Sequence, residues 1–215
     1  MSRRFHTDDA GMRKRGLDAA SAAVKRGDLV VLPTDTVYGV GCDAFSFDGV
    51  AKLREAKGRG RDMPLPVLVS GPKALDGIAY GLRPVARDLV AAFWPGALTL
   101  VCTAQPSLQW DLGDTGGTVQ VRMPLHPVAI ELLTAVGPMA VTAANGPGMP
   151  APLTADDARE QLGNSVAVVL DAGRSEQSVP STIVDVTGVV PRVLREGALP
   201  VELLQEVVPH IGAAV

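Results

Sequence analysis

Short apolar runs rich in valine and leucine recur along the chain, and glycine, proline or polar turn residues bound each of them. Runs of this length and composition predict buried strands. In chain order they read DLVVL, LPVLVSG, ALTLVCTA, GTVQVRMP, PMAVTAA, VAVVLDAG, STIVDVTG and PRVLRE. A chain with this many separate strands has to form a sheet, and the faces of that sheet need a cover.

Segments with helical spacing of apolar residues alternate with the strands and would supply this cover. One begins after Ser46 or Asp48 and ends at Gly58, and Thr154 would cap a later one. The helices are expected at residues 9–27, 46–58, 83–93, 127–136, 155–163 and 201–208. In the later part of the chain strands outnumber crossover helices. We therefore predict an α/β fold with an open, twisted, mixed sheet flanked by helices.

Length and composition fit one domain of this kind. The chain has 215 residues, 47% hydrophobic but only 4% aromatic, as expected for buried strands beneath helices. No linker or internal repeat divides it, so we predict a single domain over residues 1–215, with its core at about 16–200 and short extensions. A domain of this size buries enough surface to fold without disulfides or structural metals.

The cysteines and histidines do not predict a metal site. Cys42 and Cys102 lack zinc-type spacing and are expected to be buried thiols in a reducing compartment. His6, His126 and His210 are scattered along the chain. A site built from three histidines would require all of them to converge, which nothing in the sequence indicates.

Charge and hydropathy restrict the partners and the location. The formal net charge of −3 disfavours a general coating of nucleic acid, so any site for a polyanion has to be local. The charged N-terminal segment is not followed by the apolar stretch of a signal peptide, and no apolar run approaches the ~20 residues of a membrane helix. We therefore expect a cytoplasmic protein without a membrane segment.

Motifs for phosphate loops and for serine hydrolases are missing from the sequence. Neither G-x-x-x-x-G-K-[ST] nor G-x-S-x-G occurs. GVGCDA, residues 39–44, is similar to the G-x-G-x-x-A dinucleotide fingerprint, which needs a strand directly before it and a helix directly after it. Here Pro33 to Tyr38 intervene and the next helix begins near Asp48, so a dinucleotide site is not predicted.

The segment PTDTVYGVG leaves a predicted strand with hydroxyl and carboxylate side chains. Thr34, Asp35 and Thr36 would stand at the end of that strand, where ligands bind in open α/β sheets. The same residues could form a turn in which the side chains satisfy their own backbone. The local pattern does not decide between these two interpretations.

Three cations, Lys57, Arg59 and Arg61, crowd into five positions ahead of a predicted strand. Lys57 belongs to the end of a helix, where solvated charges usually do nothing specific. The two arginines lie beyond Gly58, in a loop that can wrap phosphate oxygens by charge-assisted hydrogen bonds.

Arg122 and Arg195 are further cations on two separate predicted strands. Arg122 shares a polar strand face with Gln120, because Val119 and Val121 alternate with them. The pattern alone favours exposed or ion-paired arginines. If Arg122 and Arg195 lie near the basic loop in the folded protein, however, these cations together could hold a triphosphate without a P-loop.

Six segments, taken in order, resemble the YrdC/TsaC family, the threonylcarbamoyl-AMP synthases. They are LPTDTVYGVG, KGRGRDMPL, WPGALTLV, VQVRMPLHP, VTAANGPG and STIVDV…PRVLREGAL. The likeness extends from about Asp28 to Leu199, and a K-x-R-x-x-x-x-P-L element is complete from Lys57 to Leu65. One such segment is a weak signal, whereas six in the same order are a strong one.

The resemblance implies a YrdC-like fold with a basic concave face, and a specific reaction. The family makes threonylcarbamoyl-AMP and pyrophosphate from L-threonine, bicarbonate and ATP, with Mg²⁺ accompanying ATP. The product serves t6A formation at position 37 of ANN-decoding tRNAs, so other t6A-pathway proteins would be partners. Such an adenylyl transfer depends on positioning and charge neutralisation and needs no catalytic triad.

By position, the resemblance also implies the residues of the site. Lys57 and Arg59 would act in catalysis. The ATP-binding residues would be Lys57, Arg59, Thr118, Thr142, Asn145 and Arg195. The threonine-binding residues would be Thr34, Arg122 and Ser181, with the planar guanidinium of Arg122 as the partner of the substrate carboxylate. No protein ligand to a metal is implied.

Three features depart from the family pattern. Ala143 stands where the family commonly has serine, the loop GPGMPAP lacks a usual serine, and Leu68 replaces a histidine of the longer members. The loss of one hydroxyl near the nucleotide would cost on the order of 1 kcal/mol. The chain resembles the short, single-domain type.

Two alternatives to the synthase stay open, and the departure at Ala143 favours the first of them. The chain could be a paralogue that binds double-stranded RNA or tRNA in the basic concavity without synthesis, although its acidity argues against strong RNA binding. It could also carry out a carbamoyl-adenylate step on another substrate, as in the related domain of hydrogenase maturation proteins. Pyrophosphate release that requires both threonine and bicarbonate would distinguish the synthase from both.

Overall fold

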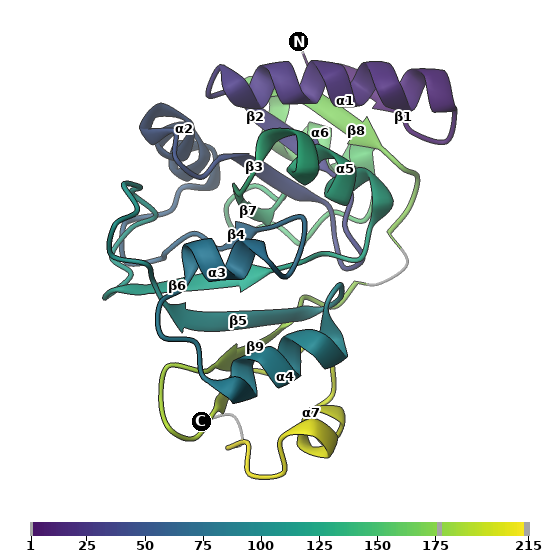
Figure 1. Ribbon diagram of the computed structural model, residues 1–215. Coiled ribbons are helices and arrows are strands. Elements are labelled where there is room, and N and C mark those ends of the chain that lie inside the picture. Colours follow the sequence, from purple (N-terminus) through teal and green to yellow (C-terminus); the bar gives the residue numbers. More distant parts are fainter. Residues whose placement is uncertain (1, 176–177, 213–215) are drawn as a thin grey trace.

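The computed structural model describes residues 2–175 and 178–212. Within these residues, one sheet of ten strands runs through the molecule with helices packed around it (Figure 1). The strand order is β1-β8-β2-β3-β7-β4-β6-β5-β9-β10. Strand β2 pairs in parallel with β8 and antiparallel with β3, so the predicted mixed sheet is confirmed.

The elements follow the predicted alternation of strands and helices. The strands are β1 (Arg3–His6), β2 (Leu29–Leu32), β3 (Gly39–Asp43), β4 (Val67–Leu68), β5 (Leu98–Thr103), β6 (Thr118–Arg122), β7 (Met139–Ala143), β8 (Val166–Asp171), β9 (Thr182–Asp185) and β10 (Arg192–Arg195). The helices are α1 (Ala10–Lys25), α2 (Phe47–Lys57), α3 (Ala74–Ile78), α4 (Pro84–Phe93), α5 (Pro127–Val136), α6 (Ala155–Leu162), the 3₁₀ helix η1 (Gly163–Ser165) and α7 (Val201–Val207).

The ends of helices α2 and α6 are set by the residues that the sequence singles out. The Ser46 hydroxyl accepts the backbone N–H of Gly49 at 3.1 Å, and Gly58 ends α2 with a φ of 56°, where a side chain would be strained. Thr154 accepts the N–H of Asp157 in the same way at the start of α6. Because Gly58 ends the helix there, Lys57 lies in its last turn and Arg59 in the loop beyond it.

Strands β1 and β3 are not assigned by the sequence analysis, which places no element at residues 3–6 and no strand at 39–43. Strand β3 is rich in glycine because it packs closely on β7: a Cβ on Gly41 would lie 2.5 Å from the carbonyl oxygen of Ala140. Strand β1 joins the sheet beside β8, and its Phe5 is buried against α1 near Gly16. Both strands are recognisable only through these tertiary contacts.

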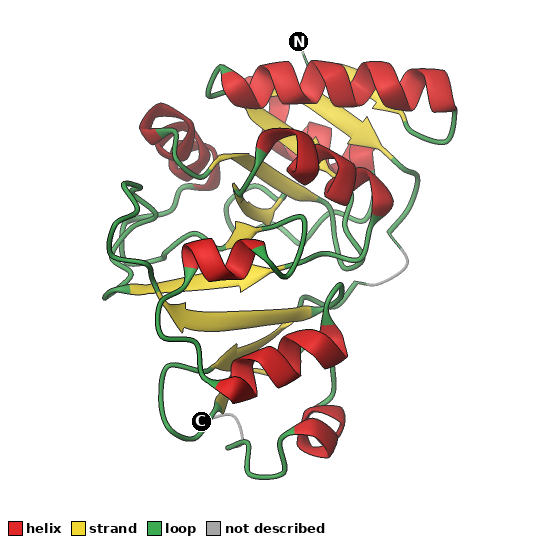
Figure 2. Ribbon diagram, in the orientation of Figure 1, coloured by secondary structure: helices red, strands yellow, loops and turns green. Residues whose placement is uncertain are grey.

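The apolar side chains of the sheet form two clusters on its opposite faces. On β2, Val30 and Leu32 pack with helices α1 and α5, whereas Leu29 and Val31 point toward α2 and α6. Farther along the sheet, α3, α4 and α7 pack on β5, β6 and β9. Figure 2 shows the resulting arrangement, with helices at both ends of the sheet.

The other face of β5, β6 and β9 lines a cavity, with polar side chains from β5 and β6 and with Ile183 from β9. On β6, Val119 and Val121 are in the core and Gln120 and Arg122 line the cavity, so the predicted polar face of this strand is confirmed. Thr99 of β5 lies on the same side. The fold thus buries one face of these strands and leaves polar side chains on the other.

Both cysteines are buried in the core. Burial raises the pKa of both Cys42 and Cys102 to about 12, which leaves each thiol protonated and unreactive, as the sequence predicts. In the part of the chain that the structure describes, no helix is both long and apolar enough to cross a membrane. Residues 2–175 and 178–212 also contain no cluster of three or more candidate metal ligands.

Thr182 fastens the loop that follows Arg195, and its replacement tests this fold. Its fully buried hydroxyl donates to the carbonyl of Leu199 (2.6 Å) and accepts the N–H groups of Gly197 (2.9 Å) and Leu199 (3.1 Å). Thr182→Val keeps the shape but leaves these groups unpaired, so we expect the free energy of unfolding to fall by about 1–3 kcal/mol in urea denaturation. The exposed Thr103 provides the control, since Thr103→Val should change it by less than about 0.5 kcal/mol. Equal changes would contradict the role of the Thr182 hydroxyl.

Candidate active site

An open cavity of about 380 Å³ lies on the face of β5, β6 and β9 opposite helices α3, α4 and α7. We call it the arginine cavity, because Arg59, Arg122 and Arg195 line it. Its walls include the turn after β2, the loop after α2 and the end of β7. Its hydroxyl and amide side chains belong to Thr34, Thr36, Thr99, Gln120, Thr142 and Ser181.

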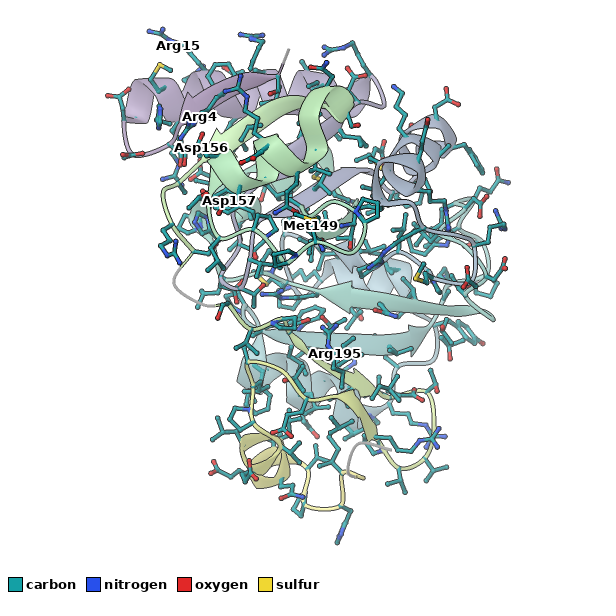
Figure 3. All side chains as sticks on the ribbon, turned by 180° about the vertical axis from the view of Figure 1, so that it is seen from behind. Arg4, Arg15, Met149, Asp156, Asp157 and Arg195 are labelled. Carbon is teal, nitrogen blue, oxygen red and sulfur yellow. The ribbon has the colours of Figure 1, made fainter. Side chains whose placement is uncertain are left out.

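The three arginines reach the arginine cavity from distant parts of the chain. Arg59 follows α2, Arg122 ends β6 and Arg195 ends β10. Figure 3 shows Arg195 over strands that no helix covers in that view. Its guanidinium donates to the backbone carbonyl of Ser181 at 2.7 Å, and among the described residues it has no carboxylate partner.

The electrostatics of the cavity favour an anion. Burial, and then the charge of Arg122, lowers the pKa of Arg195. Burial also lowers the pKa of Arg59, with a further contribution from Arg54. Both shifts mean that burial disfavours the charged form of these arginines, and a polyanion in the cavity would stabilise that form.

Arg122 is the most constrained of the three. Its Nε donates to the carbonyl of Gly96 (2.9 Å), one terminal nitrogen to the Thr36 hydroxyl (3.0 Å) and the other to the Asp35 carboxylate (2.6 Å). Burial lowers its pKa, and the charge of Asp35 opposes that shift. The guanidinium is therefore held in one orientation at the cavity wall.

The turn after β2 is closed by its own side chains, as one of the two interpretations of its sequence expects. The Thr34 hydroxyl donates to the carbonyl of Val37 (2.6 Å) and accepts the N–H of Thr36 (3.2 Å), which closes the turn. Asp35 instead reaches out of the turn to Arg122. Thr34 and Thr36 also line the arginine cavity, so their hydroxyls are within reach of a molecule bound there, and ligand binding by this turn stays a prediction.

Lys57 lies behind the cavity wall rather than in its lining. Its ammonium donates to the backbone carbonyl of Ala143 (2.8 Å), to the side chain of Asn145 (2.6 Å) and to the backbone carbonyl of Asn145. Burial, followed by the charge of Arg59, lowers its pKa to about 8. All three N–H donors are thus in use, and contact with a phosphate would require exchange of one acceptor.

Arg61 differs from its neighbours in the basic segment. It pairs with Asp111 (2.7 Å) and Asp114 (3.1 Å) on an exposed loop and does not line the arginine cavity. The sequence analysis expects both Arg59 and Arg61 to be available for phosphate. Arg61 instead fastens the loop that carries Arg59, because Asp114 also donates its N–H to the Arg61 carbonyl (2.8 Å).

The other predicted site residues divide into two groups. Thr142 and Ser181 line the arginine cavity, and the Ser181 hydroxyl lies 2.8 Å from that of Thr99. Thr118 and Asn145 do not line it: Thr118 donates to the carbonyl of Thr115, and Asn145 holds Lys57. Thr118 nevertheless lies on the same face of β6 as Arg122, four residues away along the strand.

Three further polar residues line the cavity: Thr36, which the sequence places at a strand end suited to ligands, and Thr99 and Gln120, which the sequence does not assign to a site. Gln120 could have been found from the sequence, since it shares the polar face of β6 with Arg122. Thr99 lies within an apolar run, and nothing in that run distinguishes its side chain from a core position. Its place depends on which sheet face the helices leave open.

A second cavity, of about 420 Å³, lies at the carboxyl ends of β2, β6 and β8. We call it the strand-end cavity, and Thr34, Asp35, Tyr38 and His126 are part of its lining. Thr34 lines both cavities. Burial lowers the pKa of His126, whose Nδ1 has no hydrogen-bond partner among the described residues.

Comparison with known sequences gives a family match over most of the chain. A family model that covers Sua5, YciO and YrdC, with the description "Telomere recombination", matches residues 22–197. A Mycobacterium tuberculosis protein named putative threonylcarbamoyl-AMP synthase is 58% identical over 207 residues, which cover 96% of this chain and 95% of that protein.

Solved structures give the same result for the fold. P. abyssi Sua5 complexed with L-threonine superposes with a TM-score of 0.90 and 31% identity, over 99% of this chain and 62% of the Sua5 chain. Escherichia coli YciO superposes with a TM-score of 0.84 and 25% identity, over 95% of this chain and 100% of YciO. This chain therefore spans less than two thirds of the length of the archaeal protein.

Proposed function

Because the chain belongs to the Sua5/YciO/YrdC family, we propose that it is a threonylcarbamoyl-AMP synthase, which converts L-threonine, bicarbonate and ATP to threonylcarbamoyl-AMP and pyrophosphate. The observation that carries the proposal is the convergence of Arg59, Arg122 and Arg195 on one cavity. A triphosphate and an amino-acid carboxylate are both anions, and they need several fixed cations in one place.

In the proposed complex, Arg59 and Arg195 bind the phosphates of ATP, and Lys57 joins them by exchanging a carbonyl acceptor for a phosphate oxygen. Thr118, Thr142 and Asn145 complete the nucleotide site. The arginine cavity would then be the basic concavity that the family resemblance implies. Arg195 is suited to this role because its only bonds among the described residues are to Ser181, which leaves N–H donors free.

Threonine occupies the part of the cavity beside Arg122. The guanidinium binds the substrate carboxylate, and Thr34 and Ser181, which line the same cavity, orient the rest of the molecule through their hydroxyls. Both hydroxyls are already fixed by hydrogen bonds within the protein, so they need little reorganisation to receive a ligand.

The chemistry requires positioning and charge stabilisation from these residues. Threonine and bicarbonate first condense to the carbamate, and water is released. A carbamate oxygen then forms a bond to the α-phosphorus of ATP as the bond from that phosphorus to the pyrophosphate leaving group breaks. Negative charge builds on the phosphate oxygens as pyrophosphate leaves. Fixed guanidinium groups stabilise that charge better in a cavity than water does, because their orientation is set before the reaction.

Mg²⁺ enters the proposal as the ion that accompanies ATP. Among the described residues, those that line the arginine cavity include no carboxylate, but its hydroxyls and the phosphates themselves are oxygen donors of the kind that Mg²⁺ prefers. The ion would therefore be held mainly by phosphate oxygens and water. It would neutralise phosphate charge beside Arg59 and Arg195.

The product is an activated threonylcarbamoyl group, and the proposal includes its use. It serves t6A formation at position 37 of ANN-decoding tRNAs in the cytoplasm, in association with other proteins of that pathway. Direct binding of tRNA is not needed for synthesis.

The experiment that tests this function is pyrophosphate release from ATP and Mg²⁺. We expect release only when both L-threonine and bicarbonate are present, with negligible rates when either is left out. Release that ignores threonine, or tight salt-dependent RNA binding without any release, would contradict the synthase. Identification of threonylcarbamoyl-AMP by mass spectrometry completes the test.

A further inference from the structure

Asp35 connects the two cavities. Its carboxylate lines the strand-end cavity, while its bonding partner Arg122 lines the arginine cavity. The two side chains are only 15% and 8% exposed, and their charged atoms are 2.6 Å apart. An ion pair so well shielded from water is not a solvated surface pair, and removal of one partner leaves the other charge buried and uncompensated.

The hydrogen bonds of Arg122 can be counted against its donors. A guanidinium has five N–H groups in a planar fork. The structure assigns one to Gly96, one to Thr36 and one to Asp35. Two donors therefore remain, which is the number that a bidentate carboxylate requires.

Asp35 is itself fixed from the other side. The carboxylate oxygen that accepts from Arg122 also accepts the backbone N–H of Leu125 at 2.9 Å. Leu125 follows β6, the strand that ends at Arg122. The carboxylate thus ties the turn after β2 to the end of β6 and sets the angle at which the guanidinium enters the cavity.

We propose that Asp35 is a positioning residue for the amino-acid substrate: it holds the Arg122 guanidinium so that two N–H donors face the substrate carboxylate. This inference rests on the proposed function. It assigns to Asp35 an effect on threonine alone, because Arg59 and Arg195 do not contact it and the ATP site keeps its own cations.

The test compares Asp35→Ala with Asp35→Asn in the pyrophosphate assay, with threonine and ATP varied separately. In Asp35→Ala, KM for threonine should rise about tenfold or more while KM for ATP changes less than about twofold. In Asp35→Asn, the amide oxygen can still accept from Arg122 and from the N–H of Leu125, so KM for threonine should return to within about threefold of the wild-type value. Asp76→Ala, which removes an exposed aspartate paired with Arg87, should change neither constant.

The outcomes separate the two levels of inference. If the wild-type protein shows no threonine-dependent release, the proposed function fails and the role of Asp35 fails with it. If the wild type is active and Asp35→Ala keeps its KM for threonine, or if both KM values rise together, only the positioning role is overturned. Melting curves of all variants identify unfolding. Should Asp35→Ala be unfolded, Asp35→Ser takes its place, since it also removes the carboxylate that holds Arg122 and should raise KM for threonine alone; an unchanged constant would again overturn the proposal.

Discussion

Replacement of Arg59 by alanine is expected to lower kcat/KM for ATP by about 10²–10³-fold in the pyrophosphate assay. Arg59 lines the arginine cavity, burial lowers its pKa, and no carboxylate among the described residues offsets its charge. Its guanidinium is therefore available to the phosphates, and its stabilisation should grow as pyrophosphate leaves. The measurement is the initial rate over a range of ATP concentrations at saturating threonine and bicarbonate.

Arg61 provides a matched control two residues away. It carries the same charge on the same loop, but it is 57% exposed and paired with Asp111 and Asp114. Exposed pairs of this kind contribute little, so Arg61→Ala should reduce kcat/KM for ATP by no more than about threefold. Equal losses in the two variants would show that general positive charge near the cavity, rather than the Arg59 guanidinium, drives binding.

The contrast between Arg59 and Arg61 also shows what the sequence could reveal of the site. The two residues have the same chemistry, and both follow the glycine that ends helix α2. Only the partners that the fold brings to each, a cavity for one and two aspartates for the other, separate them. The two aspartates lie 50 and 53 residues from Arg61 along the chain, beyond the reach of any local pattern.

The fold was more accessible than the site, for a physical reason. Helix ends at Ser46, Gly58 and Thr154 depend on local hydrogen bonds and backbone angles, which a few residues encode. Strand β3 depends on close contact with β7, and its glycines have no local pattern of a strand. The mixed sheet followed from counting strands against crossover helices, but the strand order could not be obtained in that way.

The Arg122–Asp35 pair belongs between these cases. Alternation along GTVQVRMP places Arg122 on a polar strand face, and that prediction is confirmed. The same pattern favours an arginine that is either exposed or ion-paired, and the structure buries Arg122 in an ion pair. From the sequence alone, ion pairing and ligand binding are competing interpretations of Arg122. The count of five donors against three protein acceptors makes them compatible, because two donors remain for a carboxylate.

Replacement of Lys57 by methionine is expected to lower kcat/KM for ATP at pH 7 by about 100-fold or more. The methionine can occupy the space of the lysine stem but removes a buried charge and three hydrogen bonds to Ala143 and Asn145. Lys52→Met is the control, because Lys52 lies on the same helix, is half-exposed and pairs with Asp28. Loss of activity in the control as well would point to damage of helix α2 as a whole.

The pH dependence distinguishes the charge of Lys57 from its bracing role. Its pKa is lowered to about 8, from about 10.4 in an unfolded chain, first by burial and then by Arg59. In the free enzyme the charge is thus lost as pH rises through 8, and kcat/KM for ATP should fall toward tenfold per unit above that pH. The free energy of unfolding should instead rise between about pH 8 and 10.4, because in that range the unfolded chain binds the proton that the folded protein has released.

Two variants make this assignment specific to Lys57. Lys57→Met should lose the inflection near pH 8 and keep a low, flat profile across it. Arg59→Ala removes the second cause of the depressed lysine pKa, so its remaining activity should decline at a higher pH than in the wild-type protein. An inflection that persists in Lys57→Met, or fails to move upward in Arg59→Ala, would assign the titration to another group. Lys57 would then be left as a brace for residues 143–145, without a charge that matters to ATP.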